Sequence, residues 1–129
     1  MPALNTLYGY GEILTRLGLA AVFLYAGFDK LTHWRESVAE VVELHLPKPT
    51  LFAVMTIVTQ LVAGAMVASG FGAAFGAIML AGFTALATVL GHRFWLLRGQ
   101  AARHEFTTAL EHVAIISGLL LLALERVAR

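Results

Sequence analysis

The chain contains no cysteine in its 129 residues. This absence excludes disulfide bonds, thiolate metal sites, cysteine-ligated iron–sulfur clusters and a thiol-based redox relay. The sequence also lacks a dinucleotide fingerprint, a phosphate-binding loop and a hydrolytic nucleophile–base motif. No cofactor is therefore encoded by a recognisable motif, and any electron transfer would depend on a quinone, a bound cofactor or a partner subunit.

Charged residues are also scarce. They make up 13% of the chain, whereas an ordinary soluble domain carries about a quarter. Hydrophobic residues reach 59%, and a chain this short has too little interior to hide them from water. The composition therefore predicts an integral membrane protein in contact with the lipid bilayer and disfavours a soluble helical bundle. The net charge of +1 and the absence of a basic run argue against a nucleic-acid partner.

Four long apolar stretches predict membrane-spanning helices, over residues 12–31, 50–69, 73–91 and 106–124. Each is long enough to cross a hydrocarbon core of about 30 Å at about 1.5 Å per residue. The predicted fold is all-α, a single four-transmembrane-helix domain over residues 1–129. Residues 1–11 are expected to form a surface lead-in. The first span is expected to be retained, because no signal-peptide cleavage site is evident.

The three connections between the spans differ. Residues 33–46 repeat apolar side chains at helical spacing, with Glu36, Glu40 and Glu43 on the opposite face. This pattern predicts a short amphipathic helix in the membrane interface, ended by the prolines of 46–49. The turn at 70–72 is so short that the second and third spans must form an antiparallel hairpin. Residues 92–105 are expected to form a polar loop.

Four spans place both termini on one side of the membrane and both polar connections on the other. The cations of the loop side are Lys30, Arg35, Lys48, Arg93, Arg98 and Arg103, against Arg16, Arg126 and Arg129 on the terminal side. By the positive-inside rule this imbalance favours cytoplasmic loops. Several loop-side cations could instead belong to a binding site, so the sequence leaves the orientation open.

Several residues are candidates for structural or interface roles. Arg16 can pair with Glu12 one turn away and reach the near interface. Trp34 and Trp95 suit the aromatic belt at the membrane surface. Gly72 and Gly76 form a G-x-x-x-G pattern that Ala77, Ala81 and Ala85 continue at intervals of four. Such stripes let helix backbones approach closely in lipid, so packing is the expected role.

Six polar residues fall in the loop-side half of the predicted bundle: Asp29, Lys30, Gln60, His92, Glu111 and His112. Ionisable groups inside a membrane are candidates for a functional site. Histidine titrates near neutral pH, and a lysine beside a carboxylate remains a charged donor. A quinone head group needs donors at its two carbonyl oxygens, and Lys30, His92 and His112 are of the right type.

Plainer interpretations of these six residues stay open. Asp29, Lys30 and Glu111 could form an ion-pair network that only fixes helix register, and His92 could be a hydrated helix end. A metal site is disfavoured, because no two of His92, Glu111 and His112 have the i,i+4 spacing of a helical metal motif.

The sequence resembles the DoxX family of small bacterial membrane proteins over residues 12–124. Each matching motif is weak alone, but their order and spacing together are specific. The motifs are Arg16-Leu-Gly18, Ala26-Gly-Phe-Asp-Lys-Leu31, Leu46-Pro-Lys-Pro49, Gly64, Gly70-Phe71, His92-Arg-Phe-Trp95, Phe106 and the stretch from His112 to Leu122. The resemblance implies a four-helix protein of the bacterial inner membrane. It also implies a link to quinone-coupled sulfur oxidation and oxidoreductase assemblies, which some relatives have.

The positions that match the family pattern are Arg16, Gly27, Lys30, Gly64, His92, Phe94 and Trp95. Gln60 stands where relatives often carry Glu, which puts a carboxylate-dependent proton step there in doubt. Glu111-His112 stands where a Lys-Asn pair is common and would give Lys30 a new partner.

Our leading hypothesis is a quinone-interacting or accessory subunit of a membrane oxidoreductase system. Lys30 and His92 would be donors to the ligand, His112 and Glu111 a proton relay, and Gln60 a deeper hydrogen-bonding group. A non-catalytic scaffold that recruits a partner, with or without homo-oligomerisation, is the alternative. A small-solute transporter is less favoured because four spans leave little room for alternating access. Whether the chain is an enzyme stays open.

Overall fold

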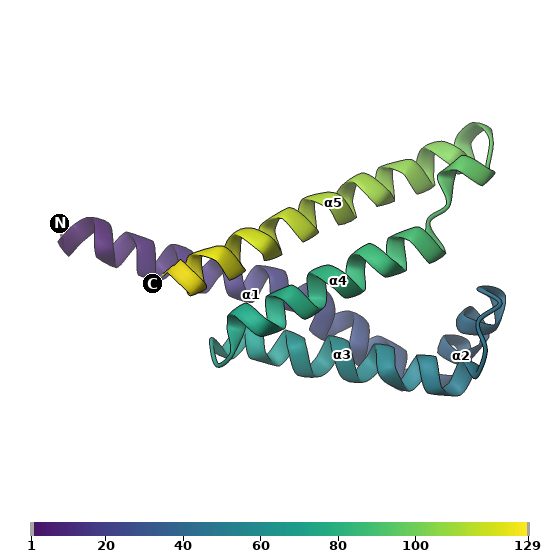
Figure 1. The fold of residues 1–129 in the computed structure, drawn as a ribbon, viewed down its shortest axis with the longest axis horizontal. Helices are drawn as coiled ribbons and strands as arrows, with labels where there is room; N and C mark the ends of the chain where they lie inside the picture. Colours follow the sequence, from purple (N-terminus) through teal and green to yellow (C-terminus); the bar gives the residue numbers. More distant parts are fainter. Residues whose placement is uncertain (1, 129) are drawn as a thin grey trace.

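The structure is a computed structural model that describes residues 2–128, and it is entirely helical over that range (Figure 1). Its elements are α1 (Pro2–Thr32), α2 (Trp34–Glu43), α3 (Pro49–Ser69), α4 (Ala73–Gly91), the short 3₁₀ helix η1 (Phe94–Leu96) and α5 (Gly99–Ala128). Helices α1, α3, α4 and α5 are long and apolar enough to cross a membrane. The predicted fold class, with a short helix between the first two spans, is confirmed.

The spanning helices pack in the order α1, α3, α4, α5, and α1 touches α5 only sparsely. Both chain termini lie at one end of the molecule (Figure 1). From that end, called the terminal side, the helices diverge toward the loop side, where the pair α4–α5 separates from α2 and α3 (Figure 1). The predicted hairpin of the second and third spans is confirmed, and α4 has the predicted bounds.

Two predicted boundaries are wrong. Residues 2–11 are not a lead-in but the first turns of α1, which begins at Pro2, a residue favoured at a helix start. The expected polar loop is shorter than predicted, because α5 begins at Gly99 and not near 106. The residues after Gly99 include alanine, glutamine, arginine and glutamate, which are good helix formers. Arg129, one of the terminal-side cations, lies outside the described residues.

The hydrophobic core occupies the terminal-side half of the bundle. Its buried residues are Ala20, Phe23, Ala63, Val67, Ala77, Leu80, Ala81, Leu119, Leu122 and Ala123. Many of these are alanines, and close approach of small residues is how membrane helices gain packing energy. Gly64 faces Leu24 of α1, and Gly76 faces the backbone of Ala63 in α3.

The predicted G-x-x-x-G stripe is only partly present. Gly76 lies in the α3–α4 interface, but Gly72 precedes α4 as its N-cap with φ of 67°, a conformation that favours glycine. Gly72 therefore makes the turn and does not pack on a helix face. Ala77 and Ala81 are buried, whereas Ala85 is exposed, so the stripe ends before it.

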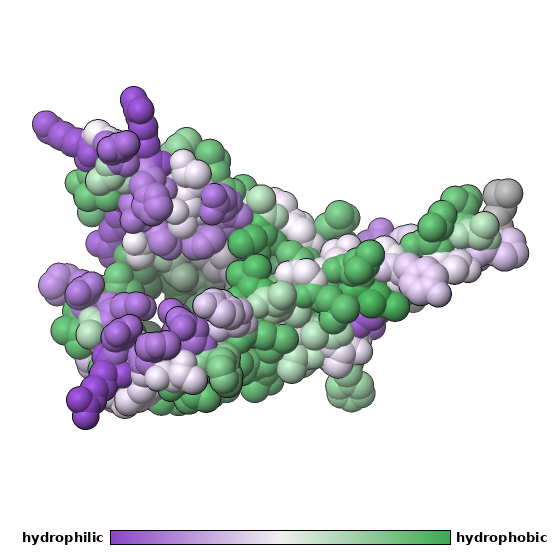
Figure 2. All heavy atoms as spheres, turned by 180° about the vertical axis from the view of Figure 1, so that it is seen from behind, coloured by the Kyte–Doolittle hydropathy of each residue, from purple (hydrophilic) through white to green (hydrophobic). Residues whose placement is uncertain are grey.

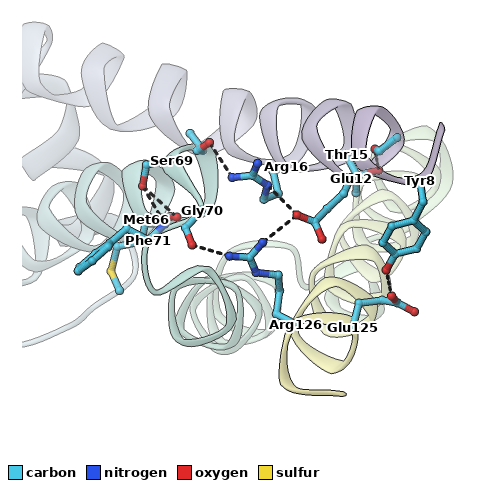
Figure 3. A network of polar contacts seen from close by, with 12 residues as sticks. Tyr8, Glu12, Thr15, Arg16, Met66, Ser69, Gly70, Phe71, Glu125 and Arg126 are labelled. Atoms are coloured by element: carbon cyan, nitrogen blue, oxygen red, sulfur yellow. Dashed lines mark hydrogen bonds and ion pairs between the residues drawn. The ribbon is translucent and has the colours of Figure 1, made fainter. Parts of the chain in front are cut away.

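An ion cluster fixes the terminal side (Figure 3). The predicted pair of Glu12 and Arg16 is present, with 3.4 Å between Arg16 Nε and Glu12 Oε1. Arg126 of α5 joins it by donating from Nη1 to the same carboxylate oxygen at 2.8 Å. One carboxylate thus serves two guanidinium groups, and it ties α1 to α5.

The two guanidinium groups of this cluster also reach the turn between α3 and α4. Arg16 donates to the Ala68 carbonyl at 3.2 Å and Arg126 to the Gly70 carbonyl at 2.7 Å (Figure 3). Gly70 has φ of 84°, and a Cβ at this position would collide with the Arg16 side chain. The ion cluster therefore holds α1, α5 and the end of α3 together on the terminal side. The helices diverge only toward the loop side.

Candidate functional site

A groove opens where α3 and α4 diverge on the loop side, with α2 and the end of α1 at its rim. Its volume is about 300 Å³. The walls are apolar, formed by Val41, Leu44, Leu46, Phe52, Ala53, Met55, Phe83, Leu86, Ala87 and Leu90. Figure 2 shows the loop end hollowed between two lobes whose rims are hydrophilic. Apolar clefts of this kind with a few polar groups are typical of ligand sites.

The polar side chains that line the groove are Lys30, Ser37, Glu40, Thr56 and Thr59. Lys30 Nζ lies 3.6 Å from Glu40 Oε2, a distance too long for a hydrogen bond. Ser37 donates to the carbonyls of Lys30 and His33, and this fastens α2 to the end of α1. Lys30 therefore retains N–H donors for a ligand, whereas the Ser37 hydroxyl is used by the fold.

The hydroxyls of Thr56 and Thr59 are unusual for this protein. Threonine in a helix commonly donates to the carbonyl four residues earlier. Six other threonines do so here: Thr6, Thr15, Thr84, Thr88, Thr107 and Thr108. Neither Thr56 nor Thr59 makes a hydrogen bond within residues 2–128, and both line the groove. Their hydroxyls are free to bond a ligand.

A second hollow of about 330 Å³ adjoins the groove, and the two share Leu44 and Leu90 in their walls. Its charged and titratable lining residues are Glu43, His45, Arg93 and Glu105. The rest of its lining is leucine and Gly91, so this hollow is mixed in character but richer in charged groups than the groove. The second hollow is therefore suited to water and ions, whereas the groove is suited to an apolar group.

Two histidines meet between α4 and α5. His92 Nδ1 lies 2.5 Å from Glu105 Oε2, and its ring stands edge-on to that of His112 with centroids 4.9 Å apart. His112 Nδ1 lies 2.8 Å from the Thr88 hydroxyl, which itself lies 2.7 Å from the Thr84 carbonyl. Because that hydroxyl gives its single proton to the carbonyl, His112 Nδ1 is assigned as the donor to Thr88.

The structure does not gather the six predicted site residues into one cluster. Asp29 and Lys30 do not pair with each other: Asp29 faces His33 at 3.3 Å, and Lys30 faces Glu40. The expectation that Glu111 gives Lys30 a partner is wrong. Glu111 is exposed on α5, and it has no ion pair within residues 2–128.

His92 and His112 do come together, but away from the groove. Gln60 belongs to neither group and lies beside Gly27 of α1, where it is 5% exposed. Its Oε1 atom has no hydrogen-bond partner among the described residues. No three His, Asp or Glu side chains in residues 2–128 are placed to hold a metal ion, so His92, His112 and Glu111 are not a ligand set there.

Sequence reasoning missed four residues of these sites. Glu40 was placed on the polar face of α2, but the side of α2 toward the groove carries Ser37, Glu40, Val41 and Leu44. Their spacing of three and four residues is itself a helical face and could have been found. Thr56, Thr59 and Glu105 gave no motif beyond their polarity.

Comparison with known proteins identifies the family. The DoxX family model matches residues 11–93, which include every residue of the groove. The chain belongs to the DoxX family. The protein described as "Inner membrane protein YphA" of Escherichia coli (strain K12) is 26% identical over 112 residues, covering 87% of this chain and 80% of the relative. No solved structure is significantly similar to the chain. This DoxX protein is a multi-pass protein of the inner membrane.

His33, between α1 and α2 of the DoxX protein, is expected to titrate above the ordinary value of 6.5. Its ring bonds the Asp29 carbonyl at 3.0 Å, and this bond, followed by the Asp29 carboxylate, raises the pKa of His33. A raised pKa stabilises the fold below the ordinary pKa, and the contribution is lost as pH rises through the folded value. The measurement is an NMR titration of the His33 ring.

The control for this titration is Asp29→Asn. It removes the carboxylate and keeps the carbonyl, so the pKa of His33 should fall only part of the way. A His33 midpoint that is the same in the folded and the denatured protein would contradict the assignment.

Proposed function

We propose that this DoxX protein is a quinone-interacting subunit of a membrane oxidoreductase system, and that the quinone head group binds in the groove between α3 and α4. One observation carries the proposal. Thr56 and Thr59 line an apolar groove, and their hydroxyls make no hydrogen bond within residues 2–128, while Lys30 at the rim has N–H donors that no acceptor in the fold uses.

The chemistry of the groove suits a head group with two carbonyl oxygens. Such oxygens accept hydrogen bonds, and Lys30, Thr56 and Thr59 are all donors. Thr59 lies about 4.5 Å deeper along α3 than Thr56, so donors are available at more than one depth. A volume of about 300 Å³ is at the lower end of small-molecule sites and accommodates a single substituted ring.

The electrons for the quinone would come from a redox partner subunit, because the chain has no cysteine and no cofactor motif. Reduction to the quinol consumes two electrons and two protons. In this proposal Glu105 replaces Glu111 as the carboxylate of the proton relay. It lines the second hollow and bonds His92, whose ring contacts His112.

The test is native mass spectrometry of the protein released gently from its own membrane. We expect a bound quinone, and we expect Lys30→Ala to weaken its binding about tenfold, since a hydrogen bond to a charged group contributes about 1.5–3 kcal/mol. Thr59→Val should also weaken binding without loss of stability, because its hydroxyl bonds nothing in the fold.

Lys48→Ala is the matched control, since Lys48 is an exposed loop-side cation that does not line the groove. The proposal is wrong if no quinone is bound, or if Lys30→Ala and Thr59→Val bind it as tightly as Lys48→Ala does. A stoichiometric protein partner without a small ligand would favour the scaffold alternative.

A further inference from the structure

We propose that the groove takes quinones with a long polyprenyl tail, and that the tail leaves sideways between Met55 of α3 and Leu86 of α4. The ligand would then exchange directly with the lipid phase. This inference rests on the proposed function and deepens it. It names the class of quinone and assigns its route of entry to two further residues.

Met55 and Leu86 have two properties together. Both line the groove, and both are exposed on the outside of the bundle, Met55 by 53% and Leu86 by 58%. An apolar residue that is exposed and also lines an apolar hollow marks the place where that hollow reaches the surface. We call the opening between these two side chains the portal.

The portal lies at the depth of the lipid tails. Met55 follows the start of α3 by six residues, about 9 Å, and Leu86 precedes the end of α4 by five, about 7.5 Å. Helix α3 has 21 residues and α4 has 19, so each is close to the length that crosses a core of about 30 Å. An opening well inside such helices faces hydrocarbon and not water.

The other directions out of the groove are unsuitable for an apolar tail. Toward the terminal side, Phe83 packs against the hydrophobic core, and the backbones of α3 and α4 close on each other at Gly76 and Ala63. Toward the loops, the second hollow carries Glu43, His45, Arg93 and Glu105 among its lining leucines. Desolvating those groups with a hydrocarbon chain would be costly. The portal is the apolar exit.

The size of the groove makes an exit necessary. A volume of about 300 Å³ holds a ring but not a ring with a polyprenyl chain. A tailed ligand must therefore extend through the wall, and its chain would gain contacts with Met55 and Leu86 that a head group alone lacks.

The experiment compares a benzoquinone carrying a long polyprenyl tail with the same head group lacking a tail. Binding of both is measured to the full chain in lipid nanodiscs. Met55→Trp and Leu86→Trp fill the portal, and we expect each to weaken binding of the tailed quinone about tenfold while the tailless one changes by less than about twofold. The tailless head group can still enter through the second hollow.

Val58→Trp and Val89→Trp are matched controls. Each residue lies three positions from its portal counterpart, is exposed by 52% and 57% respectively, and does not line the groove. Neither control should change the binding of either quinone. These variants measure how an added tryptophan at an exposed position outside the portal affects quinone binding.

The outcomes separate the two proposals. If wild type binds the tailless quinone but the portal variants affect both quinones equally or neither, the portal is wrong and the head-group site stands. If wild type binds neither quinone, both the proposed function and the portal are wrong. A co-purified phospholipid that neither quinone displaces would overturn the ligand class.

Discussion

Glu12→Ala should lower the free energy of unfolding by about 3 kcal/mol, the lower end of the cost of breaking a buried ion pair. The Glu12 side chain is 10% exposed and that of Arg16 12%, so neither charge is well hydrated. Without the carboxylate, two guanidinium groups would face each other near the membrane interface with only carbonyl acceptors left (Figure 3). The measurement is unfolding by detergent titration in mixed micelles.

Glu111→Ala is the control for this prediction, because it removes the same group from the same kind of helix. Glu111 is exposed and has no ion pair within the described residues, so its loss should leave stability within about 0.5 kcal/mol of wild type, as for other surface changes. Equal stability of the two variants would show that the ion cluster contributes nothing measurable.

The hairpin and the fold class could be predicted because their signals are local. The short turn at 70–72 allows only an antiparallel connection, and the composition of each span decides its place in the bilayer. The starts of α1 and α5 could not be found by the same reasoning. Hydropathy shows where a helix leaves the lipid and not where it ends, and both helices continue beyond the apolar stretch.

The depth of each candidate site residue in the membrane could be predicted from the sequence, but the side chains that it contacts could not. Counting residues at about 1.5 Å each placed Lys30, His92 and Glu111 correctly in the loop-side half. Which of them meet depends on which helices stay in contact at that level, and α1 touches α5 only sparsely. Lys30 and Glu111 therefore do not pair, whereas His92 and His112 meet on the adjacent helices α4 and α5.

The free hydroxyls of Thr56 and Thr59 could not be inferred at all. A threonine hydroxyl can bond the carbonyl four residues earlier or turn away, and its χ1 rotamer decides between the two. Sequence does not distinguish these two residues from Thr84 or Thr88, which bond carbonyls inside their helix. Only coordinates show which hydroxyls are left for a ligand.

Gly76→Ala should lower the free energy of unfolding by about 2 kcal/mol, within the range for overpacking a tight interface. A Cβ at Gly76 would lie 2.9 Å from the Ala63 carbonyl oxygen and 3.0 Å from the Met66 Cβ. The nearest atom belongs to the backbone and cannot rotate away, so α3 and α4 must move apart. The contact lies on the terminal side of the groove, and because moving α3 and α4 apart would also shift the groove walls on those helices, binding of the tailless quinone should weaken as well.

Gly82→Ala makes the matched comparison, and the expected change has the opposite sign. Gly82 lies in the same helix, and nothing lies within 4 Å of a Cβ built there. The substitution should therefore stabilise α4 by about 0.5–1 kcal/mol, the ordinary difference between glycine and alanine in a helix. Gly64→Ala should fall between the two, because its Cβ would meet the Leu24 side chain, which can rotate. If all three variants shift stability alike, close backbone approach at Gly76 is not what holds α3 and α4 together.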